Sequence, residues 1–267
     1  MVLSRPTFRL SSESVASTCN VEGSGKAVVV SIDTDTAVES RGKCETKPWA
    51  VLIIPSSPAL VSELSPDAAS SALRECARYM IEDLSPTSID IVGACDTNFR
   101  TNVEGSFKAW GAPHVNVGKG FYLPELIARY IAGPFIADNP TVDVSEIKPR
   151  LEKPRGGALT IVVVDGSAGL TERAPLALLD AGKETHQLME KLLAGGPHAF
   201  HDDAEKEKFN ALLTPENGGV VHPDLWHELS GLEVEEAFLA LSDSSLGVGR
   251  FVAMWKGNAA GRRSTCQ

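Results

Sequence analysis

The chain has 267 residues, of which 43% are hydrophobic, which is enough to bury one large α/β core or two small ones. The formal net charge of −10 argues against a broad nucleic-acid-binding surface and against a polybasic membrane contact, because both need clustered Lys and Arg. No stretch has the length and apolar character of a bilayer-spanning helix or a signal peptide, so we expect a cytoplasmic protein.

The first part of the chain predicts an arm followed by strands. Residues 1–26 are rich in Ser, Thr and Gly and have little apolar periodicity, which predicts a flexible N-terminal arm. The run KAVVVSIDTD, residues 26–35, is typical of a strand because of its valines. Residues 49–54, WAVLII, are apolar throughout, as expected of a central strand that is covered on both faces.

A helix and a second buried strand follow. Ser65-Pro66-Asp67 offers an N-cap, a first-turn proline and a first-turn acid, so a helix should start there. Apolar residues then recur at spacings of three and four from Leu73 to Leu84, and Pro86 ends the pattern. SIDIVGAC, residues 88–95, is the next buried strand, which makes a strand–helix–strand crossover with parallel strands.

The remaining elements complete an α/β pattern. Residues 121–133 predict a short helix ended by Gly133-Pro134, and residues 137–156 predict a surface connection. The strongest strand signal is ALTIVVVDGSAG, residues 158–169, which should lie near the sheet centre. Further helices are expected near residues 180–194, 203–213 and 223–231.

The chain closes with two predicted strands, 235–243 and 247–255, joined as an antiparallel hairpin. The fold class is therefore α/β, with a mostly parallel central sheet flanked by helices and an antiparallel C-terminal hairpin. We expect one domain over residues 27–258 and a polar tail at 259–267.

Small polar residues follow three of the predicted strands. Because ligands bind at the carboxyl ends of strands in open α/β sheets, these residues predict a pocket for a small-molecule ligand. The candidates are Ser56, Ser57, Asp96, Thr97, Asp165, Ser167 and Ala168, with Asp243 of the final hairpin as a further pocket candidate.

Other chemistry is less well supported by the residues. The glycine-rich pieces lack the strand-to-helix context of a phosphate loop. Five widely spaced cysteines without a Cys-x-x-Cys pair predict reduced structural thiols. The histidine pairs His198/His201 and His222/His227 lie in charged segments that favour a solvated loop over metal ligation, and His114 fits a short strand.

A serine nucleophile is an alternative. No Gly-x-Ser-x-Gly elbow is present, and neither Ser56 nor Ser167 has an evident base. A hydrolase or transferase would have to use one of these serines beside Asp96 or Asp165.

Three segments together resemble the LigB-like family, the catalytic-subunit family of class III extradiol ring-cleavage dioxygenases, in its divergent actinobacterial branch. They are IIPSSPALVSEL at 53–64, IVVVDGSAGLTERAP at 161–175 and EEAFLALSDSSLGVGRFVAMW at 235–255. The resemblance implies an α/β fold, a ferrous iron held by two histidines and a glutamate, and a further histidine as acid/base. Such a facial ligand set leaves positions open for catecholate and dioxygen.

The chain departs from this pattern at each expected imidazole. Ser56, Thr97 and Ala168 stand where the resemblance implies the two histidine ligands and the acid/base histidine, and Asp243 is the nearest carboxylate in the final hairpin. The resemblance thus implies a degenerate metal site, no cofactor, and a non-catalytic binding or structural role.

Two metal alternatives remain open at this point. Asp96, Asp165 and Asp243 could hold a hard divalent cation through oxygen ligands. Alternatively, an active dioxygenase or other metal-dependent enzyme could hold Fe(II) or another divalent cation through His114, His198 and His201. The sequence also leaves open whether the chain forms a homo-oligomer.

Overall fold

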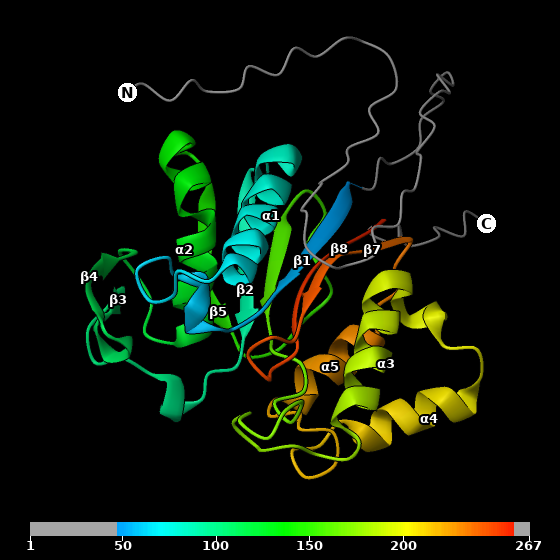
Figure 1. Cartoon of the computed structure of the whole chain (residues 1–267). Helices are drawn as coiled ribbons and strands as arrows, with labels where there is room; N and C mark the ends of the chain where they lie inside the picture. Colours follow the sequence, from blue (N-terminus) through cyan, green and yellow to red (C-terminus); the bar gives the residue numbers. More distant parts are fainter. Residues whose placement is uncertain (1–46, 259–267) are drawn as a thin grey trace, which may run out of the picture. The chain divides into compact units, whose positions relative to one another are not determined.

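A computed structural model describes residues 47–258, and six of their strands form one sheet (Figure 1). The sheet order is β5-β2-β6-β1-β8-β7. The first four of these strands are mutually parallel, β8 is antiparallel to β1, and β7 is antiparallel to β8. The predicted fold class is confirmed. The strands are β1 Pro48–Ile54, β2 Ser88–Gly93, β5 Asp143–Lys148, β6 Leu159–Val163, β7 Glu236–Asp243 and β8 Arg250–Asn258.

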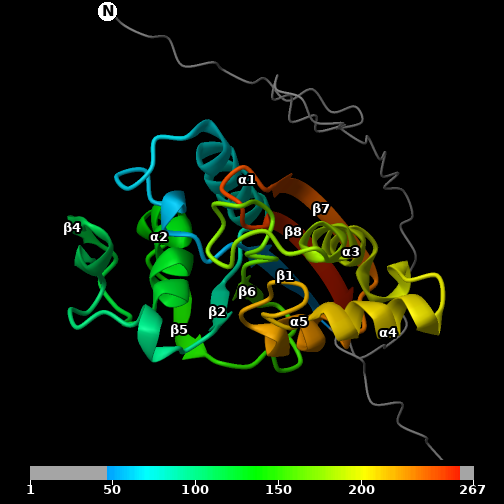
Figure 2. The ribbon, with the colours of Figure 1, turned by 60° about the horizontal axis from the view of Figure 1, so that its bottom comes forward.

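Helices cover both faces of this sheet (Figures 1 and 2). One face carries α1 (Ala68–Leu84) and α2 (Leu123–Asp138). The opposite face carries α3 (Gly182–Gly195), α4 (Asp203–Leu212) and α5 (Pro223–Ser230). Short 3-10 helices at Pro58–Leu60, Thr97–Phe99, Lys108–Trp110 and Gly196–Ala199 and a small sheet of β3 (Ser106–Phe107) and β4 (Ala112–Asn116) complete the described elements. None of the helices in residues 47–258 combines the length and apolar character needed to cross a bilayer.

The apolar run of β1 supplies two cores. Successive side chains of a strand point to opposite faces, so Leu52 and Ile54 pack with α1 and α2, whereas Val51 and Ile53 pack with α3 and α5. All four side chains are fully buried. An alternating strand could not have satisfied both layers, which explains why residues 49–54 are continuously hydrophobic.

The central strands diverge at their carboxyl ends. Strand β1 leads into α1 on one face, whereas its neighbour β6 leads towards α3 on the other (Figure 1). Ile54 and Val163 are register partners at this point. Such a divergence is where ligands bind in open α/β sheets. We call the loops that follow β1, β2 and β6, together with the β7–β8 loop, the carboxyl end of the sheet.

The first helix begins later than the sequence predicts. Asp67, rather than Ser65, is the N-cap of α1, and its Oδ1 accepts a hydrogen bond of 2.8 Å from the Ser70 N–H. Ser65 instead donates its hydroxyl to Asp67 Oδ2 at 2.6 Å. A carboxylate is a stronger acceptor than a hydroxyl, so Asp67 takes the capping position.

Two predictions in the middle of the chain are wrong. Helix α2 does not end at Gly133-Pro134 but runs through Pro134 to Asp138, because burial of Ile131, Ala132 and Phe135 outweighs the interruption. The connection at 137–156 contains β5, which pairs with β2 at the sheet edge. Its half-exposed alternation of charged and apolar residues reflects this edge position.

Other predictions lie outside the described residues. These are the arm at residues 1–26, the strand at 26–35 and the tail at 259–267, so the proposed domain start at residue 27 stays a prediction. The C-terminal hairpin is confirmed as β7–β8, and β6 occupies the centre of the sheet as expected.

The glycine before the helical proline gives a first test. A Cβ on Gly133 would meet nothing within 4 Å beyond its chain neighbours, but the ring of Pro134 disfavours a helical residue with a Cβ before it. Gly133→Ala should therefore change the free energy of unfolding by less than about 1 kcal/mol in urea titrations. A Cβ on Gly93 would lie 2.6 Å from Pro124 Cβ, so Gly93→Ala should lower it by about 1–3 kcal/mol. Equal effects of the two substitutions would contradict this packing.

Candidate functional site

Ser56 and Asp165 meet at the carboxyl end of the sheet. The Ser56 N–H donates a hydrogen bond of 2.9 Å to Asp165 Oδ1, which links the ends of β1 and β6. On the other side, the indole N–H of Trp226 from α5 donates to the Asp165 carbonyl at 2.9 Å. The structure therefore brings together two residues that are separated by 109 positions in the chain.

The ionisation of Asp165 is shifted by its surroundings. Burial raises the pKa of this carboxyl to about 6, although the hydrogen bond from Ser56 and the positive charge of Arg250 favour the ionised form. Desolvation therefore dominates over the attractive interactions. Asp165 can change its charge near neutral pH, which an exposed aspartate does not.

Arg250 is the residue at this site that sequence reasoning missed. It is the first residue of β8 and is fully buried. Its Nε and Nη2 donate to Asp243 Oδ2 at 2.9 and 2.5 Å, and its Nη1 donates to Ser70 Oγ at 2.5 Å. The available signal was a single charged residue at the start of the apolar run RFVAMW.

Asp67 adds a second carboxylate to this guanidinium. Its Oδ1 lies 3.9 Å from Arg250 Nη2. Burial alone would raise the pKa of Asp67, but hydrogen bonds from Ser65 and Ser70 and the charge of Arg250 lower it to about 2. The guanidinium thus joins the start of α1 to the end of β7.

The loop after β2 holds a separate polar group. Asp96 caps the 3-10 helix Thr97–Phe99 by accepting a hydrogen bond of 2.8 Å from the Asn98 N–H, and Thr97 is exposed. The ring of His222, the residue before α5, lies 6.2 Å from that of Phe99. Burial lowers the pKa of His222, and the nearby Asp96 carboxylate opposes this shift.

The loop after β6 is closely packed by backbone. Ser167 is fully buried, and its Oγ accepts a hydrogen bond of 3.3 Å from the Gly169 N–H. The Ala168 N–H donates to the Gly219 carbonyl at 2.8 Å. Gly219 has a φ of +72°, and a Cβ there would lie 2.9 Å from Ser167 Oγ. Ala168 is itself buried in this closely packed loop.

The two candidate serine nucleophiles lack a base among the described residues. Ser167 Oγ is bonded to a backbone N–H, and Ser56 contacts Asp165 through its backbone rather than its hydroxyl. Ser57 is half-buried and precedes the 3-10 helix Pro58–Leu60 without a side-chain capping bond. The arrangement does not provide the activated hydroxyl that nucleophilic catalysis needs.

The described residues show no three-ligand group at either of the two candidate metal sites. Within residues 47–258, no three His, Cys, Asp or Glu side chains are grouped so that they could hold a metal ion. Asp243 pairs with Arg250 and Asp96 caps a helix, so neither converges with Asp165. His114 is exposed on β4, whereas His198 and His201 are exposed near the start of α4.

The residues present do not fit a ferrous iron. The positions at which the family resemblance implies imidazoles hold the hydroxyl groups of Ser56 and Thr97 and the methyl group of Ala168. Neutral hydroxyls are weak ligands for Fe(II), and a methyl group cannot transfer a proton.

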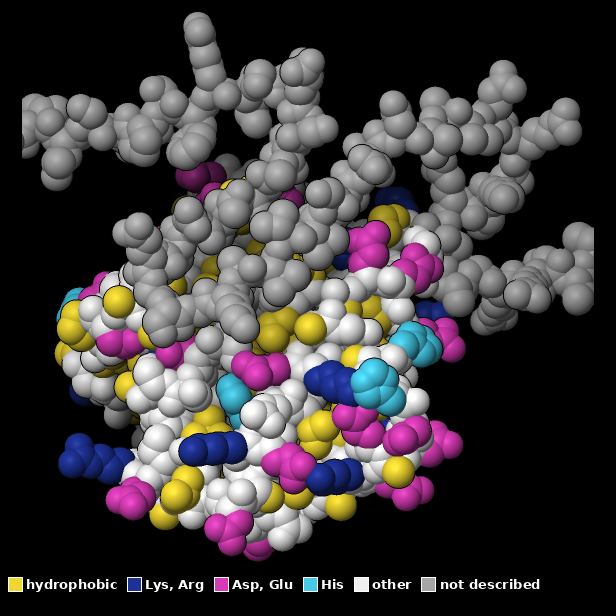
Figure 3. All heavy atoms as spheres, turned by 45° about the vertical axis from the view of Figure 1, so that its right-hand side comes forward, with side chains coloured by type: hydrophobic (Ala, Val, Ile, Leu, Met, Phe, Trp, Pro, Cys, Tyr) yellow, Lys and Arg dark blue, Asp and Glu magenta, His cyan; other side chains and the backbone are white. Residues whose placement is uncertain are grey.

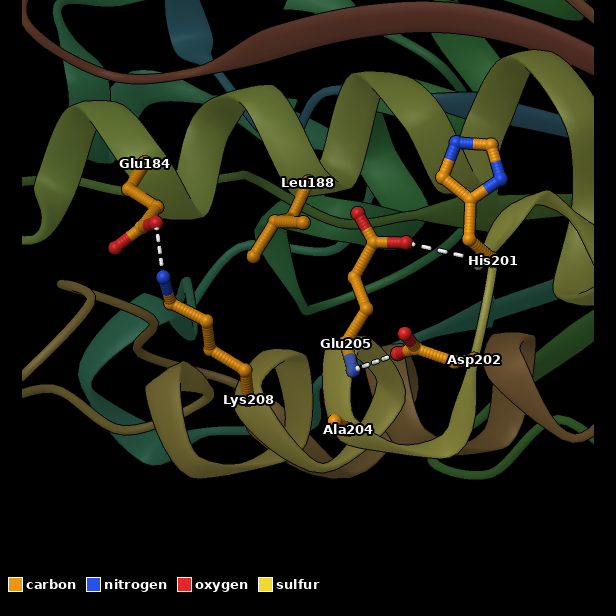
Figure 4. Close-up of a pocket in the computed structure, with 7 residues that line it drawn as sticks. All are labelled: Glu184, Leu188, His201, Asp202, Ala204, Glu205 and Lys208. Atoms are coloured by element: carbon orange, nitrogen blue, oxygen red, sulfur yellow. Dashed lines mark hydrogen bonds and ion pairs between the residues drawn. The ribbon is translucent and has the colours of Figure 1, made fainter.

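A cavity of about 430 Å³ lies away from this end, between α3 and α4 (Figure 4). Lys208 pairs with Glu184 across it, and Glu205 accepts hydrogen bonds from the His201 N–H and from Lys191. Figure 3 shows that charges of both signs are interspersed on the face that it displays. These ion pairs connect the two helices. Of the candidate residues predicted from sequence, His201 alone lines this cavity.

A scan against protein-family models finds no match, and no curated protein sequence is significantly similar to the chain. The LigB-like resemblance therefore depends on the residues at 53–64, 161–175 and 235–255 alone.

The raised pKa of Asp165 predicts a pH-dependent stability. Because its pKa is about 6 when folded and 3.8 ordinarily, the native state binds the additional proton, and stability falls as pH rises from about 4 to 6. Asp165→Asn stays neutral, so at about pH 7.5 its free energy of unfolding in urea titrations should exceed that of the original protein by up to about 3 kcal/mol. At about pH 4 the two proteins should have similar free energies of unfolding. The exposed Asp83→Asn is the control. A destabilised Asp165→Asn at the higher pH would contradict the dominance of desolvation.

Asp67 predicts the opposite pH dependence. Its pKa of about 2 lies below the ordinary 3.8, so the stability it contributes is present above about pH 4 and is lost as pH falls towards 2. Asp67→Asn keeps a capping oxygen but removes the charge that faces Arg250. It should cost about 1 kcal/mol at neutral pH, a value that allows for solvent screening, and nothing near pH 2. Urea titrations at both pH values measure this difference, and a constant loss would contradict it.

Proposed function

We propose that the chain is a LigB-like, extradiol-dioxygenase-related protein with a degenerate metal site, and that it binds a small molecule without catalysing ring cleavage. The observation that carries this proposal is the pairing of the polar groups at the carboxyl end of the sheet. The Ser56 backbone N–H donates to the Asp165 carboxylate and the Arg250 guanidinium donates to the Asp243 carboxylate, so both carboxylates are bonded to groups of the protein itself.

The placement of the three altered positions supports the family assignment within this proposal. Ser56, Thr97 and Ala168 follow β1, β2 and β6, and β6 lies directly between the other two strands. Three residues from distant parts of the chain thus share one end of a parallel sheet. This is the arrangement that a metal site built from strand ends requires, and here the side chains have the wrong chemistry for iron.

The absence of a paired nucleophile in the described residues favours binding over hydrolysis. Ser167 is buried against backbone, and the hydroxyl of Ser56 has no base. The proposal requires no cofactor. We also place the protein in the cytoplasm, which is supported by five cysteines that show no disulfide or metal-binding spacing.

The proposal predicts that the full-length protein neither retains iron nor cleaves catechols. After anaerobic incubation with Fe(II) and desalting, elemental analysis should find far less than one iron per chain. An oxygen electrode should record no uptake with catechol or protocatechuate, because hydroxyl and methyl groups replace the expected imidazoles.

Iron content has more weight than activity in this experiment, since an unusual substrate could escape an assay with two catechols. Stoichiometric iron together with substrate-dependent oxygen uptake would overturn the proposal. An Asp165→Asn sample is a useful comparison, because any adventitious iron should be unaffected by that substitution if Asp165 is not a ligand.

A further inference from the structure

One oxygen of the Asp165 carboxylate is open to a ligand. Oδ1 accepts the Ser56 N–H, whereas Oδ2 accepts no hydrogen bond from residues 47–258. Asp165 is half-buried, and Oδ2 is not among the fully buried unpartnered side-chain atoms of this part of the chain, so this oxygen is partly exposed. A hydrogen-bond donor from outside the protein can therefore contact this oxygen.

The positive charge nearest to Asp165 is already paired. Arg250 is buried, and each of its three guanidinium nitrogens donates to an oxygen of Asp243, Ser70 or Ser245. An anionic ligand would find no free guanidinium beside Asp165. The accessible charge at this point is the negative one, which favours a cation or a strong hydrogen-bond donor.

Exposed apolar side chains are concentrated at the same end of the sheet as Asp165. Eight large hydrophobic side chains are exposed among residues 47–258, and five of them lie in loops at the carboxyl end of the sheet. A sixth lies in the α4–α5 loop, whose Gly219 carbonyl accepts a hydrogen bond from the Ala168 N–H after β6. We call these six the apolar rim. A concentration of exposed apolar side chains at one end of a fold is a feature of interaction sites, whereas scattered single residues need no explanation. The apolar rim consists of Phe99, Val103, Leu176, Leu178, Val221 and Leu246.

Backbone hydrogen bonds bring three of the rim-bearing loops together. The Leu176 N–H donates to the Ala168 carbonyl, and the Ala168 N–H donates to the Gly219 carbonyl. The Leu170 N–H donates to the Gly247 carbonyl in the β7–β8 loop. The loops that carry Leu176, Leu178, Val221 and Leu246 therefore meet at the segment that directly follows Asp165.

We propose that the carboxyl end of the sheet binds a small organic cation with an apolar body, with its ammonium group at Asp165 Oδ2 and its body against the apolar rim. This inference rests on the proposed binding function and specifies its ligand class. A charged donor on a carboxylate is about twice as strong as a neutral hydrogen bond, and the apolar body excludes water from it.

The test uses the ¹⁵N-labelled full chain and three ligands of similar shape: 2-phenylethylamine, 2-phenylethanol and phenylacetate. At about pH 7.5 Asp165 is ionised, and the amine should cause saturable shifts of the amide signals around Ser56 and Asp165. The dissociation constant should lie roughly in the millimolar range. The alcohol should bind about tenfold more weakly, and phenylacetate should not saturate.

Two pairs of variants locate the site. Asp165→Asn should weaken amine binding about tenfold, whereas Asp83→Asn, on an exposed position of α1, should not. Val221→Ser in the apolar rim should weaken it about threefold, whereas Phe238→Ser, on an exposed apolar position of β7, should not. The spectra of the variants also report whether each remains folded.

Equal binding of phenylacetate, no saturable shift with the amine, or undiminished binding by Asp165→Asn would each overturn this inference. None of these outcomes affects the proposed function if the protein still lacks iron. Stoichiometric iron with ring cleavage would instead remove the proposed function, so the two failures are distinguishable.

Discussion

The buried guanidinium of Arg250 organises the carboxyl end of the sheet. It is fixed at the start of β8, and it bonds to the end of β7 through Asp243 and to the first turn of α1 through Ser70. Burying a charge is costly unless it is paired and hydrogen-bonded. The surrounding carboxylates and hydroxyls are consequently held in place, and they cannot rearrange around a metal ion without leaving that charge unpaired.

A second requirement is imposed by the central strands, which have helices on both faces. Strands β1 and β6 pack against α1 and α2 with one set of side chains and against α3 and α5 with the other. Apart from Thr160 in β6, the side chains of both strands are apolar. Most polar residues therefore lie just past each strand, as Ser56 and Asp165 do.

The central elements could be predicted from sequence because burial on both faces leaves a continuous apolar run, as in WAVLII. The helix through Pro134 and the edge strand β5 could not, because tertiary packing and edge pairing decided them against local signals. At the site, the spacing of strand ends placed Ser56 and Asp165 correctly. The role of Arg250 depends on partners from α1 and β7, far apart in the chain, and no local pattern reports such a pairing.

The position of β6 has a consequence for how the chain assembles. β1, β2 and β5 all precede β6 in the sequence, yet β6 lies between β1 and β2. During synthesis, the facing sides of β1 and β2 therefore have unpaired backbone groups until β6 has emerged. Bringing together partners as distant as Ser56 and Asp165 carries a loop-closure cost that local contacts do not offset. We expect the insertion of β6 between β1 and β2 to limit the folding rate. The unpaired sides of β1 and β2 should be the points at which a nascent chain is most prone to aggregation.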